Sequence, residues 1–310
     1  MSGDYYYGDL NPHLIGLGMK DILERALRLI VSKKTGFVAR IKAGKTGLMD
    51  DVLTDADTEA QAMMVSLLRE RFPFFGVVAE EEDPSNPCPK GVSRPLIIPS
   101  THPHFEKLFF TIDPVDGTKA FVRRQSHGVA SMLALVRNGE VIAAYVMDVG
   151  TWELFGFRPE SKKVHKIVGM DHGEPLVIDT SDLLADKYAL LRDPLDTYSP
   201  LMQRFVGNSG VVRSHNIEGG SIGMSFTHLW LGYMGMIVLH PGFQTPWDLA
   251  PVLGISQKMG FVFLEVDSET GEASLWNPAI TMQTFKTENE IVVVHGAYED
   301  SVRELLLASK

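Results

Sequence analysis

The stretch TIDPVDGTKAF, residues 111–121, places two aspartates close together at the end of an apolar run. Asp113 and Asp116 enclose a proline and a valine, and Gly117 follows. Proline and glycine at these positions predict a tight turn, which makes the two carboxylates neighbours. At a separation of about 4 Å and an effective dielectric of about 20, two such charges repel by about 4 kcal/mol. Either one carboxyl is protonated, or cations lie between the two.

The flanking sequence places this turn between a strand and a helix. Residues 107–112 (KLFFTI) form an apolar run typical of a buried strand, and residues 119–124 (KAFVRR) suit a short helix that Gly117 and Thr118 open. The free N–H groups and the positive dipole end at a helix start favour a phosphate group. We therefore expect an anion site beside two carboxylates of the kind that bind Mg²⁺.

Acidic residues also lie at the ends of other expected elements. Glu80 follows an apolar strand at 74–78, Asp57 lies at the start of an expected helix, and Asp248 opens another. Each has an ordinary explanation when taken singly, such as helix capping or an acidic surface turn. Together with the aspartate pair they favour a two-metal site for phosphoryl transfer, in which one ion activates a water and the other stabilises the leaving oxygen.

Helical and strand-type patterns alternate along the chain, and no internal repeat is evident. The Asn138-Gly139 pair between two apolar runs predicts a β-hairpin. Helices are expected at 19–34, 57–72 (capped by Asp57 or Thr58), 221–235 and 246–260, and strands at 74–78, 107–112, 129–136, 141–148, 236–240 and 261–266. Residues 158–210 have a weaker pattern and are expected to connect two parts of the chain. The alternation predicts layered α/β architecture with a large antiparallel component.

Composition restricts the class of protein. The 310 residues are 45% apolar, enough for a large core, and carry a formal charge of −10, which argues against a general nucleic-acid-binding face. The single cysteine, Cys88, excludes an internal disulfide and is expected to be an ordinary loop residue in a reducing compartment. No secretory signal is evident, and the longest apolar run is too short to cross a membrane. We expect a cytoplasmic protein that binds neither nucleic acid nor membrane.

Four motifs resemble those of the inositol monophosphatase superfamily of Mg²⁺-dependent, lithium-sensitive phosphatases. They are Leu53–Asp57 (LTDAD), Ala79–Glu81 (AEE), Asp113–Thr118 (DPVDGT) and Trp247–Ala250 (WDLA), in the family's order and spacing across roughly residues 20–300. The resemblance implies an αβαβα sandwich of alternating helix and sheet layers. It also implies an N-terminal half (1–155) and a C-terminal half (156–310) packed as one compact unit.

The resemblance also implies roles for individual residues. Thr118 would orient the attacking water with Asp57 behind it, so that Thr118, Asp57, Glu80 and Asp113 form the catalytic group. The metal ligands would be Glu80, Asp113, the Val115 carbonyl, Asp116 and Asp248, holding two or three Mg²⁺ ions. Substrate would contact Gly117, Thr118, Asp116, Ser221 and Asp248. All of these ligands are oxygen donors, as a hard cation requires.

The sequence departs from the family pattern in places that leave choices open. Ala79 replaces a glycine and three glutamates follow it, so that Glu81 is an alternative to Glu80 as the metal ligand. Ser221 suits either substrate contact or a simple helix cap, and Arg213 and His215 suit either substrate contact or a surface loop. The family resemblance implies a homodimer.

The substrate is also open. A small phosphorylated metabolite of the inositol-1-phosphate type is expected. The 3'(2'),5'-bisphosphate nucleotidase, histidinol-phosphatase and fructose-1,6-bisphosphatase branches are the alternatives, and the Lys119 context resembles the first two. An aspartyl-phosphate enzyme is a different class, but it requires Asp-x-Asp, whereas two residues separate Asp113 from Asp116. A non-catalytic phosphometabolite-binding protein on the same scaffold is the remaining alternative.

Overall fold

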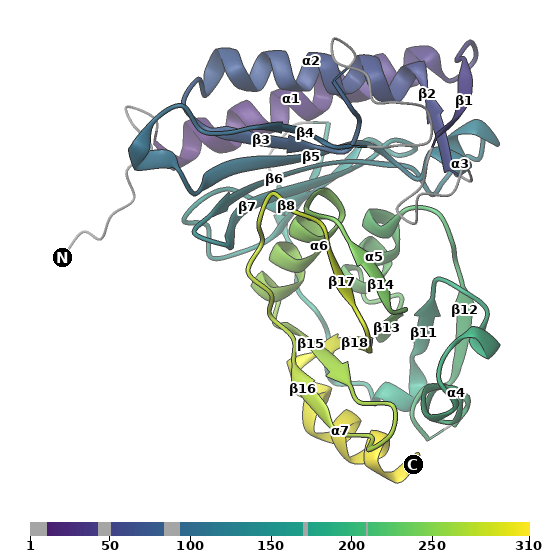
Figure 1. The fold of residues 1–310 in the computed structure, drawn as a ribbon. Coiled ribbons are helices and arrows are strands. Elements are labelled where there is room, and N and C mark those ends of the chain that lie inside the picture. The colour runs from purple at the N-terminus through teal and green to yellow at the C-terminus, as the bar shows by residue number, and fades with distance from the viewer. Residues whose placement is uncertain (1–10, 43–50, 84–93, 170–172, 209) are drawn as a thin grey trace.

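The computed structural model describes residues 11–42, 51–83, 94–169, 173–208 and 210–310 as alternating layers of helix and sheet (Figure 1). The helices α1 and α2 cover the outer face of a first sheet, α5 and α6 lie between this sheet and a second one, and α4 and α7 cover the second sheet's far face. The α-helices are α1 (Pro12–Lys33), α2 (Asp55–Arg71), α3 (Thr118–Val122), α4 (Pro200–Gly207), α5 (Ile222–Trp230), α6 (Pro246–Lys258) and α7 (Glu299–Ala308). This arrangement confirms the expected αβαβα fold class.

The first sheet runs in the order β10-β9-β8-β7-β6-β5-β3-β4 and is mainly antiparallel. Its strands are β3 (Gly76–Ala79), β4 (Leu96–Ile98), β5 (Leu108–Asp116), β6 (Ala130–Arg137), β7 (Glu140–Asp148), β8 (Glu153–Phe157), β9 (His165–Val168) and β10 (Glu174–Pro175). The exception is the parallel pair β3 and β5. Because parallel neighbours end at the same edge of a sheet, the residues that follow β3 lie beside the end of β5.

The second sheet runs in the order β12-β11-β13-β18-β15-β16. Its strands are β11 (Tyr188–Leu191), β12 (Ser214–Ile217), β13 (Met236–Leu239), β15 (Phe261–Val266), β16 (Ala273–Leu275) and β18 (Glu290–His295). Separate short pairs are β1 (Ala39–Lys42) with β2 (Asp51–Thr54), and β14 (Gly242–Gln244) with β17 (Phe285–Thr287). Short 3₁₀ turns occur at η1 (Pro103–Phe105), η2 (Leu184–Asp186), η3 (Leu195–Thr197) and η4 (Gly296–Tyr298).

Buried apolar side chains fill the spaces between the layers. In β6, Leu133 and Leu135 pack toward α1 and α2, whereas Met132, Ala134 and Val136 pack on the opposite face toward α5 and α6. A strand buried on both faces reads as a continuous apolar run, which explains the sequence of β6. A third apolar cluster lies between the second sheet and the helices α4 and α7.

Several expected elements occur where the sequence predicts them. The hairpin joins β6 to β7 through Asn138 and Gly139, whose φ angles of 53° and 86° are the left-handed values that such a turn requires. The strands β3, β13 and β15 and the helix α6 also occur where they were expected. Residues 158–210, expected to be a connection, contain β9, β10, β11 and α4. Cys88 lies outside the described residues.

Two local predictions were wrong. The sequence predicted a tight turn over residues 113–116, but β5 continues through Asp116, with a register shift against β6 between Asp113 and Asp116. A bulge of this kind bends a strand and reorients its side chains, so it serves the purpose that we expected of the turn. The helix α2 is capped by Thr54 rather than by Asp57 or Thr58, and Asp57 lies inside its first turn.

No described helix is long and apolar enough to cross a membrane.

Candidate functional site

The acidic residues of the candidate site come from elements that are distant in sequence. Asp113 and Asp116 lie in the last part of β5, and Glu80 directly follows β3. Because β3 and β5 are parallel, with Ala79 opposite Ile112, the backbone N–H of Glu80 donates to the carbonyl of Ile112 at 3.1 Å. Asp248 lies in the first turn of α6, a helix that packs against β5.

Electrostatics show that these four acids lie close together. Burial raises the pKa of Asp113 well above its usual value, and the charges of Glu80, Asp116 and Asp248 raise it further. A hydrogen bond with the Asp248 side chain acts in the same direction. The Oδ1 atom of Asp113 is buried and has no hydrogen-bond partner. An orphaned carboxylate oxygen surrounded by other acids is an environment that favours a bound cation.

Asp116 is held by the start of α5. Its Oδ2 accepts hydrogen bonds from Ser221 Oγ at 2.6 Å and from the Gly223 N–H at 2.7 Å, and its Oδ1 accepts one from the Ile222 N–H at 3.1 Å. Burial and then the charge of Asp248 raise the pKa of Asp116 to about 7, although these three donors act in the opposite direction. Ser221 is the N-cap of α5, which confirms the capping role considered for it.

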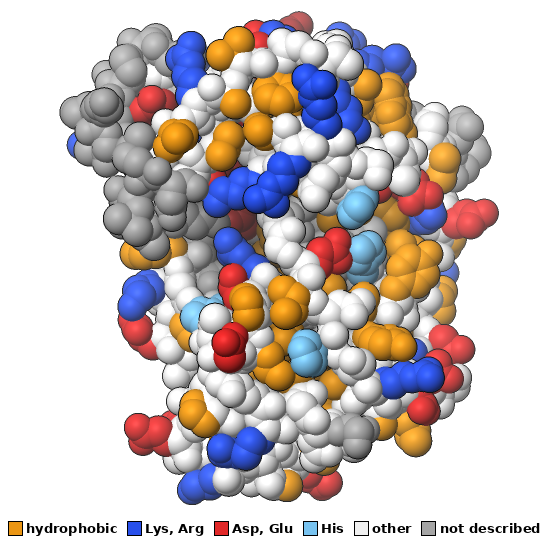
Figure 2. All heavy atoms as spheres, turned by 90° about the vertical axis from the view of Figure 1, so that its right-hand side faces the viewer, with side chains coloured by type: hydrophobic (Ala, Val, Ile, Leu, Met, Phe, Trp, Pro, Cys, Tyr) orange, Lys and Arg blue, Asp and Glu red, His pale blue; other side chains and the backbone are white. Residues whose placement is uncertain are grey.

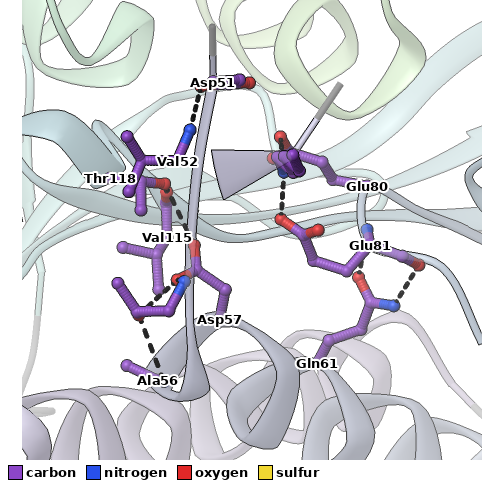
Figure 3. Close-up of polar contacts among 11 residues, drawn as sticks. Asp51, Val52, Ala56, Asp57, Gln61, Glu80, Glu81, Val115 and Thr118 are labelled. Atoms are coloured by element: carbon purple, nitrogen blue, oxygen red, sulfur yellow. Dashed lines mark hydrogen bonds and ion pairs between the residues drawn. The ribbon is translucent and has the colours of Figure 1, made fainter. Parts of the chain in front are cut away.

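Thr118 and Asp57 meet at the start of α3. The Thr118 hydroxyl lies 3.0 Å from Asp57 Oδ1 and 3.0 Å from the Val115 carbonyl (Figure 3). The other Asp57 oxygen accepts hydrogen bonds from the Thr54 N–H and the Thr54 hydroxyl, which completes the capping box of α2. Burial raises the pKa of Asp57 to about 6, even though the bonds from Thr54 lower it. The Asp57 carboxyl can therefore gain or lose a proton near neutral pH.

Gly117 lies between the acids and α3 in a conformation that other residues rarely adopt. Its φ angle is +93°, and a Cβ atom at this position would lie 2.2 Å from the carbonyl oxygen of Gly128. A Cβ would also lie 3.1 Å from the Cβ of Ser221. Only glycine fits this close approach, which keeps the turn next to Asp116 narrow.

A lysine that the sequence reasoning missed lies beside the glutamates. Lys42, at the end of β1, places its ammonium 3.1 Å from Glu80 Oε1 and 2.5 Å from Glu81 Oε1. Burial alone would lower the pKa of Lys42, but the charges of Glu80 and Glu81 outweigh it and raise this pKa. Lys42 and Glu80 are 38 positions apart in the sequence, and nothing in the sequence between them indicated this contact.

The backbone of Glu81 is fixed by a second residue that the sequence reasoning missed. Gln61 of α2 donates from Nε2 to the Glu81 carbonyl at 2.5 Å and accepts from the Glu81 N–H at 2.8 Å (Figure 3). Gln61 lies four residues after Asp57, on the same face of α2, so helical spacing was a usable signal. Burial and then the charge of Glu80 raise the pKa of Glu81 to about 8.

The donor set fits a hard divalent cation. Every candidate ligand is a carboxylate or carbonyl oxygen, and Asp113 Oδ1 has no competing partner. Within the described ranges, no three His, Cys, Asp or Glu side chains have the close arrangement of a formed metal site. Protein groups engage part of the set, with Lys42 on Glu80 and Ser221 on Asp116.

The sequence-predicted site residues come from β5, α2, α3 and α6, from Glu80 directly after β3, and from the N-cap of α5. After burial, the charge of Glu80 raises the pKa of Asp113 most. This favours Glu80 over Glu81 as the acidic neighbour of Asp113. His215 lies on the wall of a neighbouring pocket with His127, Glu218 and His228, of which only His215 was proposed for substrate contact.

Comparison with known proteins agrees with this geometry. The model of the inositol monophosphatase family matches residues 19–295 of the chain. The chain belongs to the inositol monophosphatase family. The match spans all four sequence motifs and both sheets.

Individual relatives align in sequence with part of this chain. The fructose-1,6-bisphosphatase/inositol-1-monophosphatase of Thermotoga maritima is 35% identical over 116 residues, covering 36% of this chain and 31% of that protein. Human 3'(2'),5'-bisphosphate nucleotidase 1 is 27% identical over 141 residues, covering 37% of this chain and 43% of that protein. Each alignment therefore spans less than half of the relative's own length.

Solved structures show the same fold across nearly the whole chain. A structure of an IMPase/NADP phosphatase complexed with Mg²⁺ and phosphate superposes with a TM-score of 0.68. It is 16% identical in sequence, and the superposition covers 95% of each chain.

Proposed function

We propose that this chain is a Mg²⁺-dependent phosphomonoesterase that hydrolyses a small phosphorylated metabolite with a metal-activated water. The observation that carries the proposal is the mutual electrostatic influence of Glu80, Asp113, Asp116 and Asp248 next to the Thr118–Asp57 pair. Family membership supports it, since two aligned relatives are named as a fructose-1,6-bisphosphatase/inositol-1-monophosphatase and a 3'(2'),5'-bisphosphate nucleotidase. The structural neighbour complexed with Mg²⁺ and phosphate supports the choice of ion.

The residues that would hold the ions are Glu80, Asp113, Asp116 and Asp248 with the Val115 carbonyl, for two or three ions in total. Bound there, Mg²⁺ would neutralise phosphate oxygens and lower the pKa of a water. The chain's own contribution is positional. The Thr118 hydroxyl donates a hydrogen bond to Asp57, which leaves the Thr118 oxygen free to accept a hydrogen bond from the attacking water.

The phosphate would lie at the turn formed by Gly117 and Thr118, at the start of α3, where backbone N–H groups favour an anion. Ser221 and two backbone N–H groups donate to Asp116 and favour its ionised form, which a bound cation would favour further.

The central experiment is phosphate release from a panel of esters with and without Mg²⁺, repeated with Li⁺. The panel contains inositol-1-phosphate, fructose-1,6-bisphosphate, adenosine 3',5'-bisphosphate, histidinol phosphate and p-nitrophenyl phosphate. We expect release only with Mg²⁺ and inhibition by Li⁺. If none of the five esters released phosphate, the proposal would be overturned and a non-catalytic binding protein would be favoured.

Two variants test the assignment of roles. Asp116→Asn should keep the fold and lose most activity because a metal ion loses a charged ligand. Thr118→Ala should lower kcat more than it raises KM, since positioning of the water matters mainly in the transition state. Asp179→Asn, at an exposed turn where Asp179 accepts the Ser181 N–H, is the matched control and should leave activity unchanged. Full activity of Asp116→Asn would refute the assignment.

The assembly and location of the protein remain predictions. We propose a homodimer in the cytoplasm. Sedimentation of the purified chain tests the dimer, and a sedimentation coefficient of a 34.3 kDa monomer at micromolar concentration would refute it.

A further inference from the structure

Asp248 differs from the other candidate metal ligands in how the chain reaches it. Asp113 and Asp116 lie in the first sheet and Glu80 directly follows one of its strands, whereas Asp248 lies in α6, which the chain enters from β13 of the second sheet through β14. Figure 2 shows a hollow near the middle of one face, where these two parts of the molecule meet. The position of Asp248 relative to the other three acids therefore depends on what holds the start of α6.

The first turn of α6 lacks two of the hydrogen bonds that commonly fix a helix start. Thr245, the N-cap residue, makes no capping bond with its side chain, and its buried hydroxyl has no hydrogen-bond partner among the described residues. Pro251 lies inside the helix and has no N–H to donate to the carbonyl of Trp247, four residues earlier. The turn that carries Asp248 is therefore held weakly by α6 itself.

The strand that leads into α6 provides another attachment. β14 ends one residue before the N-cap Thr245 and pairs with β17, with Gly242 opposite Thr287. Because Leu239 of β13 lies opposite Ile291 of β18, the β14–β17 pair prolongs the β13–β18 pair of the second sheet. Figure 1 shows β14 and β17 above β13 and β18, on the side of the first sheet. A movement of β14 along β17 would carry the start of α6 with it.

The strand β17 is anchored to both sheets. It ends three residues before Glu290, where β18 begins between β13 and β15 in the second sheet. The segment before β17 lies against the first sheet, since the Ile280 N–H donates to the Gly139 carbonyl at 2.9 Å. Met282 also reaches the first sheet, because a Cβ atom added at Gly76 would lie 2.5 Å from its Cε. β17 is thus a fixed partner against which β14 can be held.

The hydroxyl of Thr287 joins the two strands. It accepts a hydrogen bond from the Gly242 N–H at 3.2 Å, donates one to the Gly242 carbonyl at 3.1 Å, and accepts another from Gln244 Nε2 at 3.3 Å. These three bonds use the one proton and both lone pairs of the hydroxyl, and Thr287 is buried. Two strands of this length pair weakly on their own, so the hydroxyl contributes to their register.

We propose that Thr287 is a positioning residue for the candidate metal ligand Asp248 and acts through Gly242 and β14 on the first turn of α6. The proposal rests on the proposed Mg²⁺-dependent activity. Mg²⁺ requires nearly ideal octahedral geometry, so a small displacement of one carboxylate weakens its binding. The role of Thr287 is to keep Asp248 beside Asp113, with which Asp248 shares a hydrogen bond.

Calorimetric titration of the full-length chain with MgCl₂ measures this role without turnover. Thr287→Val keeps the shape of the side chain and removes the hydroxyl, so it should weaken Mg²⁺ binding at least about fivefold, as expected for loss of a neutral hydrogen bond. Thr287→Ser keeps the hydroxyl and should bind Mg²⁺ within about twofold of the wild type. Equal Mg²⁺ affinities of Thr287→Val and the wild type would overturn the proposal.

The matched control is Thr270→Val at the turn between β15 and β16. The Thr270 hydroxyl accepts a hydrogen bond from the Glu272 N–H at 3.2 Å, so the same chemical change is made far along the chain from α6. Mg²⁺ affinity should stay within about twofold, since distant sites act independently. If Thr270→Val weakened Mg²⁺ binding as much as Thr287→Val, the effect would be general and the proposal would be overturned.

A second substitution tests whether the effect passes through the first turn of α6. Pro251→Ala restores an N–H that can bond to the Trp247 carbonyl and should tie the turn to the rest of the helix. In the Pro251→Ala background, Thr287→Val should weaken Mg²⁺ binding by less than about twofold, because the two changes are coupled. An equal loss in both backgrounds would overturn the proposed route.

Gln244→Met covers the case in which Thr287→Val does not fold, because it removes only one of the three bonds to the hydroxyl. It should weaken Mg²⁺ binding by about twofold to threefold, the lower end expected for one neutral hydrogen bond. Urea unfolding of each variant separates this role from a purely structural one. Lower stability with unchanged Mg²⁺ affinity would overturn the proposal.

Turnover of p-nitrophenyl phosphate separates this proposal from the proposed activity. In Thr287→Val the Mg²⁺ concentration for half-maximal rate should rise with the calorimetric Kd, whereas kcat at saturating Mg²⁺ should stay within about twofold. If no ester is hydrolysed, the proposed activity fails while a difference in Mg²⁺ affinity still supports the role of Thr287. If the wild type binds no Mg²⁺, both proposals are overturned.

Discussion

Replacing Ser221 with alanine tests whether α5 holds Asp116 in its charged form. The Ser221 hydroxyl donates to Asp116 Oδ2 at 2.6 Å and accepts from the Met224 N–H at 2.9 Å. A hydrogen bond to a charged group contributes about 1.5–3 kcal/mol, and loss of an N-cap costs about 1 kcal/mol. Ser221→Ala should therefore lower the free energy of unfolding by about 3 kcal/mol at a pH where Asp116 is ionised.

The size of this effect should depend on pH. Burial raises the pKa of Asp116 to about 7, and removal of a donor to the ionised form raises it further. At pH 5 the protonated Asp116 loses only a weak hydrogen bond, whereas at pH 8.5 the ionised group loses a strong one. The stability difference between wild type and Ser221→Ala should thus grow as the pH rises through about 7.

The assay is urea unfolding of the metal-free protein, followed by tryptophan fluorescence at pH 5 and pH 8.5. Ser225→Ala is the matched control, because Ser225 lies in the same helix and donates only to the Ser221 carbonyl, at 2.9 Å. We expect this control to lose less than about 1 kcal/mol, as a neutral hydrogen bond within a helix does. Equal losses in the two variants, or a Ser221→Ala effect that does not vary with pH, would refute the reasoning.

Three further predictions concern the same region. Gly117→Ala should lower the free energy of unfolding by about 1–3 kcal/mol, because its Cβ would lie 2.2 Å from the Gly128 carbonyl at a φ of +93°; urea unfolding measures this. Gln61→Leu should lower the free energy of unfolding by about 2–5 kcal/mol in the same measurement, because the buried N–H and carbonyl of Glu81 lose their hydrogen bonds to the Gln61 side chain. The metal-free wild type should lose thermal stability between pH 5 and pH 8, because the folded chain holds a proton on Asp116 that the unfolded chain has released above about pH 4. Mg²⁺ should therefore raise Tm more at pH 8 than at pH 5, as scanning fluorimetry would show.

The two substitutions have matched controls, and each argument has an outcome that would contradict it. Gly36→Ala should have little effect, because no atom lies within 4 Å of the added methyl group. Gln257→Leu removes an exposed hydrogen bond to Asn277 and should cost less than Gln61→Leu. A Gly117→Ala variant as stable as Gly36→Ala would contradict the close-approach argument. A Mg²⁺ effect on Tm that is the same at both pH values would contradict the titration argument.

The layers of the fold were predictable because the apolar patterns are strong and local. Asn138 and Gly139 specify a hairpin through their own left-handed conformations, and β15 is bounded by Gly260, whose φ is +90°. The continuation of β5 through Asp116 was not predictable from local chemistry. Pro114 and Gly117 suit a turn, but the neighbouring strand β6 supplies pairing as far as Asp116 and favours a bulge instead.

The members of the candidate site were predictable by residue type and motif, whereas their supporting contacts were not. The predicted proximity of Asp113 and Asp116, together with acids at the ends of other expected elements, indicated a cation. The partner that Glu80 meets in the structure, Lys42, comes from a separate hairpin and depends on how β1 packs. Likewise, Glu218 and His228 lie ten residues apart across a strand-to-helix connection, and only the folded chain brings them to 3.3 Å.

The ammonium of Lys42 supplies the acidic centre with a counter-ion that belongs to the chain itself. Because Lys42 already balances part of the charge of Glu80 and Glu81, the chain can close this centre during folding before any ion arrives. Binding of the proposed Mg²⁺ at Glu80 would then be an exchange, because the ion and Lys42 would compete for the same carboxylate. The affinity for the ion would thus depend on how readily the β1–β2 pair moves to release Lys42 from Glu80. Residues of β1 and β2 that bind no ion would then influence this affinity.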